Sequence, residues 1–417
     1  MATTLWDKLG GGSYIVSANT PPKQALAEAV AKSGADWQTL ARNGWAGPLH
    51  QLIHSHKVRD LFVQHPGQVW VRDARGHKSR EAVHITDGWV RFLANLWHNG
   101  PSSKNGDPSD PLDPYAVTRK TLLFADGSGG MRWVYCPATF SSWGPSLYIR
   151  RLPSKPLPLS EMVRNGTLPQ AAADMLVAFL ATGTPMIVSG QTGAGKTTLL
   201  GALIHELQML VDPLNLLIVE RTHEIPVTQP AYRWEQDAGG KVSLDHLAEK
   251  ATQMGLEWLV LGECTGPEAY FVAKAFSQGV PAMTTLHASS APAAVKKLAM
   301  LSLEYVQDPR LLPVIMNDLA DQGLVSVHLS LKEREPFGLL GTVTGIVETI
   351  GVSGESDPVV NPLWEWKDEV GGLAWNPGSL SQLSEATEQR FVAAGRTFPV
   401  PAASTTEGKK GGSFWRR

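Results

Sequence analysis

The pattern of hydrophobic and polar positions changes near residue 152. Before that point, short β-rich runs alternate with turn residues, and Lys57–Gly76 predicts a hairpin with turns at His65-Pro66-Gly67 and Ala74-Arg75-Gly76. The next segment, 85–100, places apolar residues at helical spacing and predicts a core-facing helix: Trp89, Phe92, Leu93, Leu96 and Trp97. Further strand-like runs follow, so we predict a small α+β domain over residues 46–151.

Beyond this domain, helical segments alternate with short apolar runs. The segment Leu152–Ser160 has three prolines in nine residues, which is typical of a linker, and we assign residues 152–165 to it. Four apolar runs, "PMIVSG", "LNLLIVE", "EWLVLGE" and "PAMTTLH", then predict a mostly parallel α/β sheet. Two later runs, "GLVSVHLSLK" and "GLLGTVTGIVETIGV", predict antiparallel strands that close the core of a domain over residues 166–376.

Both ends of the chain lack such a pattern. Residues 1–45 are rich in glycine, serine and proline around one short helical stretch, "PPKQALAEAVAKSG", and predict a flexible, loosely attached extension. Residues 377–417 are polar and predict a mobile tail.

Composition narrows the class of protein. The chain is 43% hydrophobic and 18% charged, with a formal net charge of −2, so it carries no bulk signal for nucleic acid or an anionic membrane. Its two cysteines, Cys136 and Cys264, exclude a disulfide framework and a four-cysteine zinc site, and they suit a reducing compartment. No run reaches the roughly 18 apolar residues that span a bilayer. We expect a cytoplasmic protein that reaches the membrane only through partners.

One motif predicts a nucleotide site. Residues 190–197 match G-x-x-x-x-G-K-[ST] in full, between a strand-like run and the helical run "KTTLLGALIHEL". The glycines let backbone N–H groups cradle phosphate, Lys196 reaches the β- and γ-phosphates, and the Thr197 hydroxyl ligates Mg²⁺. We therefore predict ATP and Mg²⁺ as cofactors, held by Gly190, Gln191, Thr192, Gly193, Ala194, Gly195, Lys196, Thr197 and Thr198.

Three later residues are candidates for the chemistry. Glu220 and Glu263 end two strand-like runs, and His287 ends a third. Because the carboxyl ends of parallel strands face the ligand crevice, both carboxylates should lie beside Mg²⁺ and the γ-phosphate. One acid would hold the metal through water, while the other orients or deprotonates the attacking water. We assign Glu263 to the metal with Thr197, and the residues leave open which acid is the base. Taken alone, His287 is equally typical of a buried structural histidine.

Four segments together resemble the secretion ATPases of type II and type IV systems, over nearly all of residues 46–370. "GQTGAGKTTLL" is similar to their Walker A motif, "VERTHEI" to their Asp box, "LVLGECTGPEA" to their Walker B motif and "MTTLHASSAPAAVKKL" to their His box. The resemblance implies a RecA-like P-loop NTPase core of the α/β class with a smaller α+β, PAS-like N-terminal domain. It also implies that Glu220, Glu263, His287 and Lys196 act in ATP hydrolysis.

The same resemblance implies an assembly and a task. Members form homo-oligomers, as a rule hexamers, that convert ATP hydrolysis into domain motion against an inner-membrane platform protein, driving pilus assembly or protein export. By the match of "MRWVYC" and "LYIRR", Arg132 and Arg150, with Arg151 as a further candidate, would close over the phosphates. Within the family, the missing zinc cysteines argue against the type II secretion and pilus-extension branch. The short N-terminal domain with "LYIRR" resembles the branch that serves Tad-type pili. We expect no nucleic acid partner and no direct membrane insertion.

Four positions depart from the family pattern. Arg221 stands where the Asp box has aspartate, and Gln253, Gly255 and Thr265 stand where relatives carry arginines. These departures keep two rivals open: a catalytically weak or inactive ATP-binding paralogue in a mixed ring, and a DNA-transfer ATPase of a conjugation system.

Overall fold

The computed structural model describes residues 16–401, apart from 56, 66, 74–75, 100–110, 125–128, 237–241, 335–337 and 355. The predicted turns around residues 66 and 74–75 and most of the loop after the 85–100 helix therefore lie outside the described residues, as does the tail from 402 onward.

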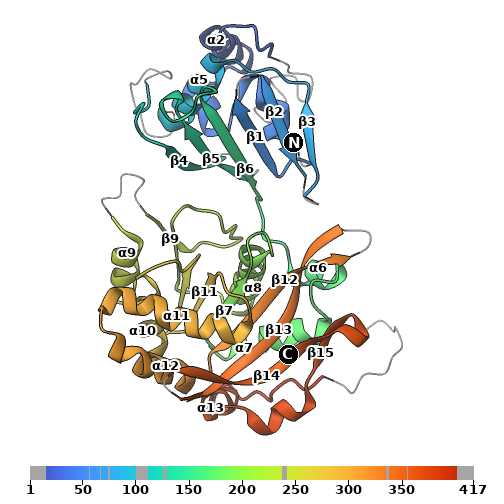
Figure 1. The fold of residues 1–417 in the computed structure, drawn as a ribbon, viewed down its shortest axis with the longest axis vertical. Helices are drawn as coiled ribbons and strands as arrows, with labels where there is room; N and C mark the ends of the chain where they lie inside the picture. Colours follow the sequence, from blue (N-terminus) through green and yellow to red (C-terminus); the bar gives the residue numbers. More distant parts are fainter. Residues whose placement is uncertain are drawn as a thin grey trace.

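The first part of the chain forms a six-stranded antiparallel sheet with the order β3-β2-β1-β6-β5-β4 (Figure 1). Its strands are β1 (Asp60–His65), β2 (Gln68–Arg72), β3 (Lys78–Glu81), β4 (Thr118–Leu123), β5 (Gly130–Cys136) and β6 (Ser146–Leu152). The predicted hairpin is confirmed, because β1 pairs antiparallel with β2. The predicted helix is also confirmed as α5 (Asp87–Asn99), which buries Trp89 and Trp97.

The predicted loose attachment of residues 1–45 is wrong for the part that the structure describes. There the chain forms α2 (Pro22–Ser33) and α3 (Trp37–Arg42), followed by η2 (Gly47–Leu49) and α4 (His50–Ile53). The apolar side chains of Ala25, Leu26 and Leu40 join the same core as α5. The indole Nε1 of Trp97 donates to the carbonyl of Trp45 at 2.9 Å. Burial of this narrow apolar stripe outweighs the local excess of glycine, serine and proline.

The second part of the chain contains a nine-stranded sheet, ordered β15-β14-β13-β12-β7-β11-β10-β8-β9 (Figure 1). The six strands from β12 to β9 run parallel, and β13, β14 and β15 add antiparallel pairs, as the sequence predicts. The strands are β7 (Met186–Gly190), β8 (Leu216–Glu220), β9 (Tyr232–Glu235), β10 (Trp258–Leu261), β11 (Ala282–Leu286), β12 (Val325–Arg334), β13 (Gly338–Ser353), β14 (Asp357–Lys367) and β15 (Gly372–Trp375).

Helices cover both faces of this sheet. Val188 of β7 belongs to the core with α7 and α8, whereas the adjacent Ile187 belongs to the core with α9, α10, α11 and α12. This division follows from the alternation of side chains along a strand. The helices are α6 (Leu159–Arg164), α7 (Gln170–Ala181), α8 (Lys196–Leu210), α9 (Leu244–Ala251), α10 (Ala269–Ser277), α11 (Ala291–Val306) and α12 (Leu312–Asp321), with short 3₁₀ turns η3 (Ala138–Phe140), η4 (Pro309–Leu311) and η5 (Asp368–Val370).

The two sheets are joined by the proline-rich segment between β6 and α6 (Figure 1). The domain boundaries drawn from the sequence stay predictions. No helix in the described part of the chain combines the length and apolar character needed to cross a membrane.

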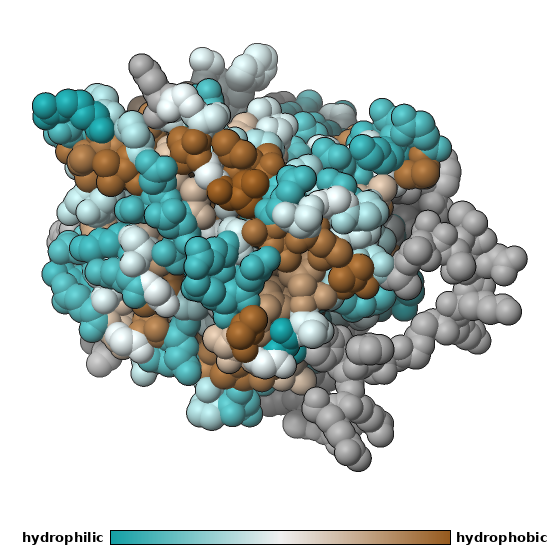
Figure 2. Space-filling model, turned by 90° about the horizontal axis from the view of Figure 1, so that it is seen from below, coloured by the Kyte–Doolittle hydropathy of each residue, from teal (hydrophilic) through white to brown (hydrophobic). Residues whose placement is uncertain are grey.

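The predicted mobile tail is wrong for residues 377–401. This stretch forms η6 (Pro377–Gln382) and α13 (Glu385–Ala393), and the ring of Phe391 packs edge-on against Phe179, with 6.0 Å between centroids. Arg390 donates to the carbonyl of Gln322 at the end of α12. A few apolar anchors in a polar sequence fix this segment. Figure 2 views the molecule from this end and shows apolar residues interspersed with polar ones.

His50 makes the stability of the fold depend on pH. Burial lowers the pKa of His50 to about 3, and the nearby His54 contributes in the same direction. The unfolded chain, with a histidine pKa of about 6.5, therefore takes up this proton first as the pH falls. The stabilisation is complete above about pH 6.5 and is lost between about pH 6.5 and 3, at up to about 1.4 kcal/mol per pH unit.

We expect His50→Gln to reduce the pH dependence of the unfolding free energy below pH 6.5 by about that slope. Urea unfolding at a series of pH values, followed by tryptophan fluorescence, measures it. His77→Gln, at a side chain that is 77% exposed, serves as the control. Equal slopes in the parent protein and in His50→Gln would contradict the assignment.

Candidate nucleotide site

A cavity of about 280 Å³ lies where the P-loop of the second sheet meets the first sheet. Its walls come from the loop before α8, from the ends of β8, β10 and β11, and from β4, β5 and β6. It brings together residues predicted separately from the sequence: Thr192, Gly193, Lys196, Thr197, Glu220, Glu263, His287, Arg132 and Arg150.

The P-loop has the backbone shape that a phosphate requires. Gly190 adopts φ +148° at the end of β7, and a Cβ there would lie 2.3 Å from the carbonyl oxygen of Leu329. Gly195 adopts φ +89° in the left-handed region directly before α8. Only glycine fits both positions at low cost. The N-terminus of α8 has no side-chain cap, so its first N–H groups are free to bind an anion.

The rest of the predicted cradle follows the same loop. Gln191 contributes its carbonyl to Lys196, and Ala194 is fully buried behind the loop rather than on the cavity wall. Thr198 follows Thr197 in the first turn of α8. The structure thus places the predicted residues on one loop, and their contacts with a nucleotide stay predictions.

Lys196 lies in the centre of the site. Its ammonium donates to the carbonyl of Gln191 and lies 3.2 Å from Nδ1 of His287. Nε2 of the same imidazole lies 3.2 Å from Oε1 of Glu263. Because an ammonium can only donate, Nδ1 of His287 is placed to accept from Lys196, and Nε2–H is placed to donate to Glu263. Burial lowers the pKa of Lys196, and attraction to Glu263 opposes that shift.

The two acids have different surroundings. Glu220 is 3% exposed, and its Oε1 accepts backbone N–H groups of Glu224 and Ile225 at 2.8 and 2.9 Å. Its Oε2 accepts from Arg233 at 2.8 Å. Burial alone would raise the pKa of Glu220, but the bonds from His223 and Arg233 outweigh it and lower the pKa. Both oxygens of Glu220 thus hold the loop after β8 in place.

Glu263 instead faces the cavity. It follows β10, its side chain is 42% exposed, and it contacts His287. A carboxylate with lone pairs open to the cavity can bind a metal-bound water or accept a proton from one. The geometry therefore distinguishes the two acids that the sequence pattern treats alike.

The arginines of the first sheet reach the site from adjacent strands. Arg132 of β5 and Arg150 of β6 stand directly opposite each other, and both line the cavity. Arg132 forms an ion pair with Glu224, and Arg150 donates to the buried Asp60 at 2.8 Å. Arg151 is the next residue along β6, so it points to the other face, where it donates to the carbonyl of Ser55 at 2.9 Å.

Three basic residues of the site have no motif in the sequence. Arg119 of β4 also lines the cavity, two residues from Thr121, which pairs with Arg132. Residues two apart on a strand lie on the same face, so Arg119 could be assigned to the site only if β4 and its register were already known. Arg233 reaches Glu220 from β9. His328 of β12 lies beneath the P-loop, with Nδ1 3.0 Å from the Ser189 hydroxyl, and burial lowers its pKa.

The donor set fits Mg²⁺ carried by a nucleotide. Thr197 and Glu263 line the cavity, and among the described residues no group of three or more His, Cys, Asp or Glu could hold a metal by itself. Mg²⁺ keeps several waters and needs only one or two protein oxygens beside substrate phosphates. Thr197 and Glu263 are therefore the residues that would hold it.

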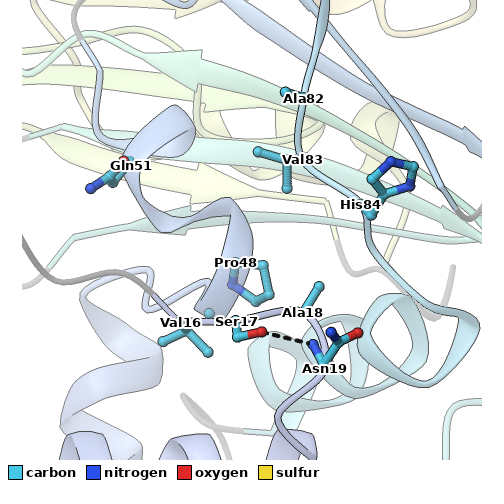
Figure 3. A pocket seen from close by; sticks show the side chains of 10 residues that line it. Val16, Ser17, Ala18, Asn19, Pro48, Gln51, Ala82, Val83 and His84 are labelled. Atoms are coloured by element: carbon cyan, nitrogen blue, oxygen red, sulfur yellow. Dashed lines mark hydrogen bonds between the residues drawn. The ribbon is translucent and has the colours of Figure 1, made fainter.

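A second cavity, of about 310 Å³, lies within the first part of the chain (Figure 3). The segment 16–19, η2 and residues 82–84 line it, and His84 is its one titratable lining residue. It lacks charged groups that converge on one point, so the P-loop cavity is the candidate functional site.

Comparison with known proteins supports the resemblance found in the sequence. The family model described as "Type II/IV secretion system protein" matches residues 124–330, which include all four predicted boxes. This segment of the chain is therefore similar to that family. The branch within the family, predicted as that of Tad-type pili, stays a prediction.

Two curated relatives illustrate the match. The probable conjugal transfer protein TrbB of Sinorhizobium fredii is 31% identical over 195 residues, which are 46% of this chain and 57% of that protein. The type IV secretion system protein PtlH homolog of Bordetella bronchiseptica is 25% identical over 283 residues, covering 62% and 80%. The chain thus spans less than two thirds of the TrbB relative.

A solved structure confirms the predicted fold. The ATPase DotB of Legionella pneumophila superposes with a TM-score of 0.52 at 17% identity, covering 72% of this chain and 78% of DotB. The chain therefore has the RecA-like α/β core with a smaller N-terminal domain.

Proposed function

We propose that the chain is the ATP-hydrolysing motor of a type II or type IV secretion system or of a Tad-type pilus assembly system. One observation carries the proposal: the line of contacts from Lys196 through His287 to Glu263, in a cavity that arginines of the first sheet also line. A phosphate chain, a metal-bound water and a base would fit this arrangement.

In the proposed reaction, ATP and water give ADP and phosphate. The N-terminal amides of α8 and the Lys196 ammonium hold the β- and γ-phosphates, so Lys196 exchanges its bond to His287 for bonds to phosphate. Glu263 orients the attacking water and accepts its proton, and Nε2–H of His287 holds Glu263 in place. Mg²⁺, when bound, neutralises charge on the phosphate oxygens. Glu220 keeps the neighbouring loop in position.

Arg132 offers a route from this chemistry to movement. It belongs to the first sheet, but it pairs with Glu224 in the loop that follows β8 of the second sheet. A γ-phosphate would compete with Glu224 for the guanidinium, and hydrolysis would return Arg132 to Glu224. We propose that this exchange moves the first sheet against the P-loop part through residues 152–165.

The proposed partners follow from the family. We propose a homo-oligomer, with the hexamer as the expected form, that works on the cytoplasmic side of the inner membrane against a platform protein. The name of the PtlH relative supports a role in type IV secretion. The name of the TrbB relative favours a second candidate, a DNA-transfer ATPase. The net charge of −2 speaks against a nucleic acid partner.

Phosphate release by the purified full chain tests the proposal. We expect ATP hydrolysis that requires Mg²⁺ and is unchanged by single- or double-stranded DNA. ATP binding without hydrolysis would identify an inactive paralogue instead. Stimulation by DNA that weakens as salt rises would favour the conjugative motor.

A further inference from the structure

Arg221 connects two loops of the site. It directly follows Glu220 at the end of β8, and its guanidinium extends to the loop after β10. There, Nη2 donates to the Thr265 hydroxyl and lies 3.3 Å from Oε1 of Glu268. A residue that stands in the predicted Asp box is thus bound to the loop that begins with Glu263.

Glu268 is the acceptor that shapes this loop. Its side chain is 2% exposed, and Oε1 accepts the backbone N–H groups of Thr265 and Gly266 at 2.7 and 3.1 Å. A buried carboxylate is costly unless a positive group pairs with it. Among the described residues, Arg221 is the one basic side chain recorded in an ion pair with Glu268.

The contact of Arg221 with Thr265 lies two residues beyond Glu263 in the same loop. β11 holds the residues on both sides of Glu263: the Thr285 hydroxyl donates to the carbonyl of Gly262 at 2.8 Å, and the N–H of Cys264 donates to the carbonyl of Thr285 at 2.8 Å. Beyond Cys264, Glu268 fixes Thr265 and Gly266. The Arg221–Glu268 pair therefore anchors the part of the Glu263 loop that follows Cys264.

We propose that Arg221 is a positioning residue, which holds Glu263 in its reactive place by neutralising Glu268 and thereby fixing residues 265–268. The inference rests on the proposed ATP hydrolysis. Arg221 also lines the cavity, so the alternative is a direct contact with phosphate. The two roles differ in what they change: positioning acts on kcat, whereas a phosphate contact acts on nucleotide affinity.

Steady-state kinetics of Arg221→Ala separates these roles. We expect kcat to fall by about ten- to a hundredfold, because even a small displacement of a reacting group such as Glu263 lowers the rate strongly. KM and the dissociation constant for ATP should change less than about twofold. Arg221→Lys should recover part of kcat. Low guanidinium chloride should also recover part in Arg221→Ala, relative to potassium chloride of equal ionic strength.

Two further variants complete the kinetic test. Glu268→Gln keeps the acceptor for the backbone N–H groups but removes the charge pair, so it should lower kcat to a similar extent. The double variant Arg221→Ala/Glu268→Gln should lose little more than either single variant. Arg310→Ala, at a side chain that is 89% exposed, is the matched control. Weaker ATP binding in Arg221→Ala with unchanged kcat would overturn the positioning role.

Hydrogen exchange tests the contact without any turnover. In the nucleotide-free protein, amides of Thr265 and Gly266 should exchange faster in Arg221→Ala than in the parent chain and in Arg310→Ala. Unchanged exchange would refute the proposal. If the parent chain hydrolyses no ATP, the proposed function fails, while this measurement still decides whether Arg221 holds the loop.

Discussion

Replacement of Lys196 with alanine is expected to reduce ATP hydrolysis by about a hundredfold or more. The Lys196 ammonium is a charged donor that lines the cavity where the P-loop would hold phosphate, and removal of one preorganised donor costs about that much. The rate of hydrolysis should fall by a larger factor than the affinity for ATP, because the free N–H groups at the N-terminus of α8 remain.

Phosphate release and nucleotide titration of the same preparation measure the two effects. Lys297→Ala provides the control, since Lys297 is exposed on α11 and far from the P-loop in the sequence. Equal thermal unfolding of the two variants would exclude a loss of fold as the cause. Unchanged turnover in Lys196→Ala would end the assignment of this cavity as the hydrolytic site.

Much of the core was predictable because its signals are local. The apolar runs around Val188, Val219, Val260 and Thr284 are buried strands, and each is followed by the motif that the family requires. The parallel arrangement then brings Glu220, Glu263 and His287 to one edge of the sheet. For these three residues, the parallel topology was enough to predict that they lie together.

The difference between the two acids was not predictable, because it depends on contacts between distant segments. Arg233 meets Glu220 only because β9 pairs with β8, and His287 meets Glu263 only because β11 pairs with β10. A strand-end glutamate gives no sign of which donors will surround it. The partners of Glu220 and Glu263 are set by the tertiary structure, which the local sequence does not reveal.

At the two ends of the chain, the sequence prediction was wrong because it relied on composition. Composition predicted loose segments, yet Leu26 and Phe391 are buried. A few well-spaced apolar residues offset the conformational entropy of a polar segment when a complementary surface exists. Composition describes the segment, but it contains no information on that surface.

Substitution of Glu263 with glutamine should stop hydrolysis while ATP stays bound. Glutamine preserves the shape of the side chain and its contact with His287, but it cannot accept the proton of the attacking water. Loss of a general base typically costs about 10²- to 10⁴-fold in rate. The P-loop and Lys196 are unaltered, so the affinity for ATP should remain.

Single-turnover hydrolysis, with gel filtration to detect retained ATP, would measure this trap. Glu249→Gln is a matched control, because its side chain is 41% exposed, close to the 42% of Glu263. Glu220→Gln should behave differently: it keeps an acceptor for the N–H groups of Glu224 and Ile225 but removes the buried charge opposite Arg233, so the unfolding free energy should fall as well as the rate. If Glu263→Gln kept its activity and Glu220→Gln lost activity without losing stability, the base would be Glu220.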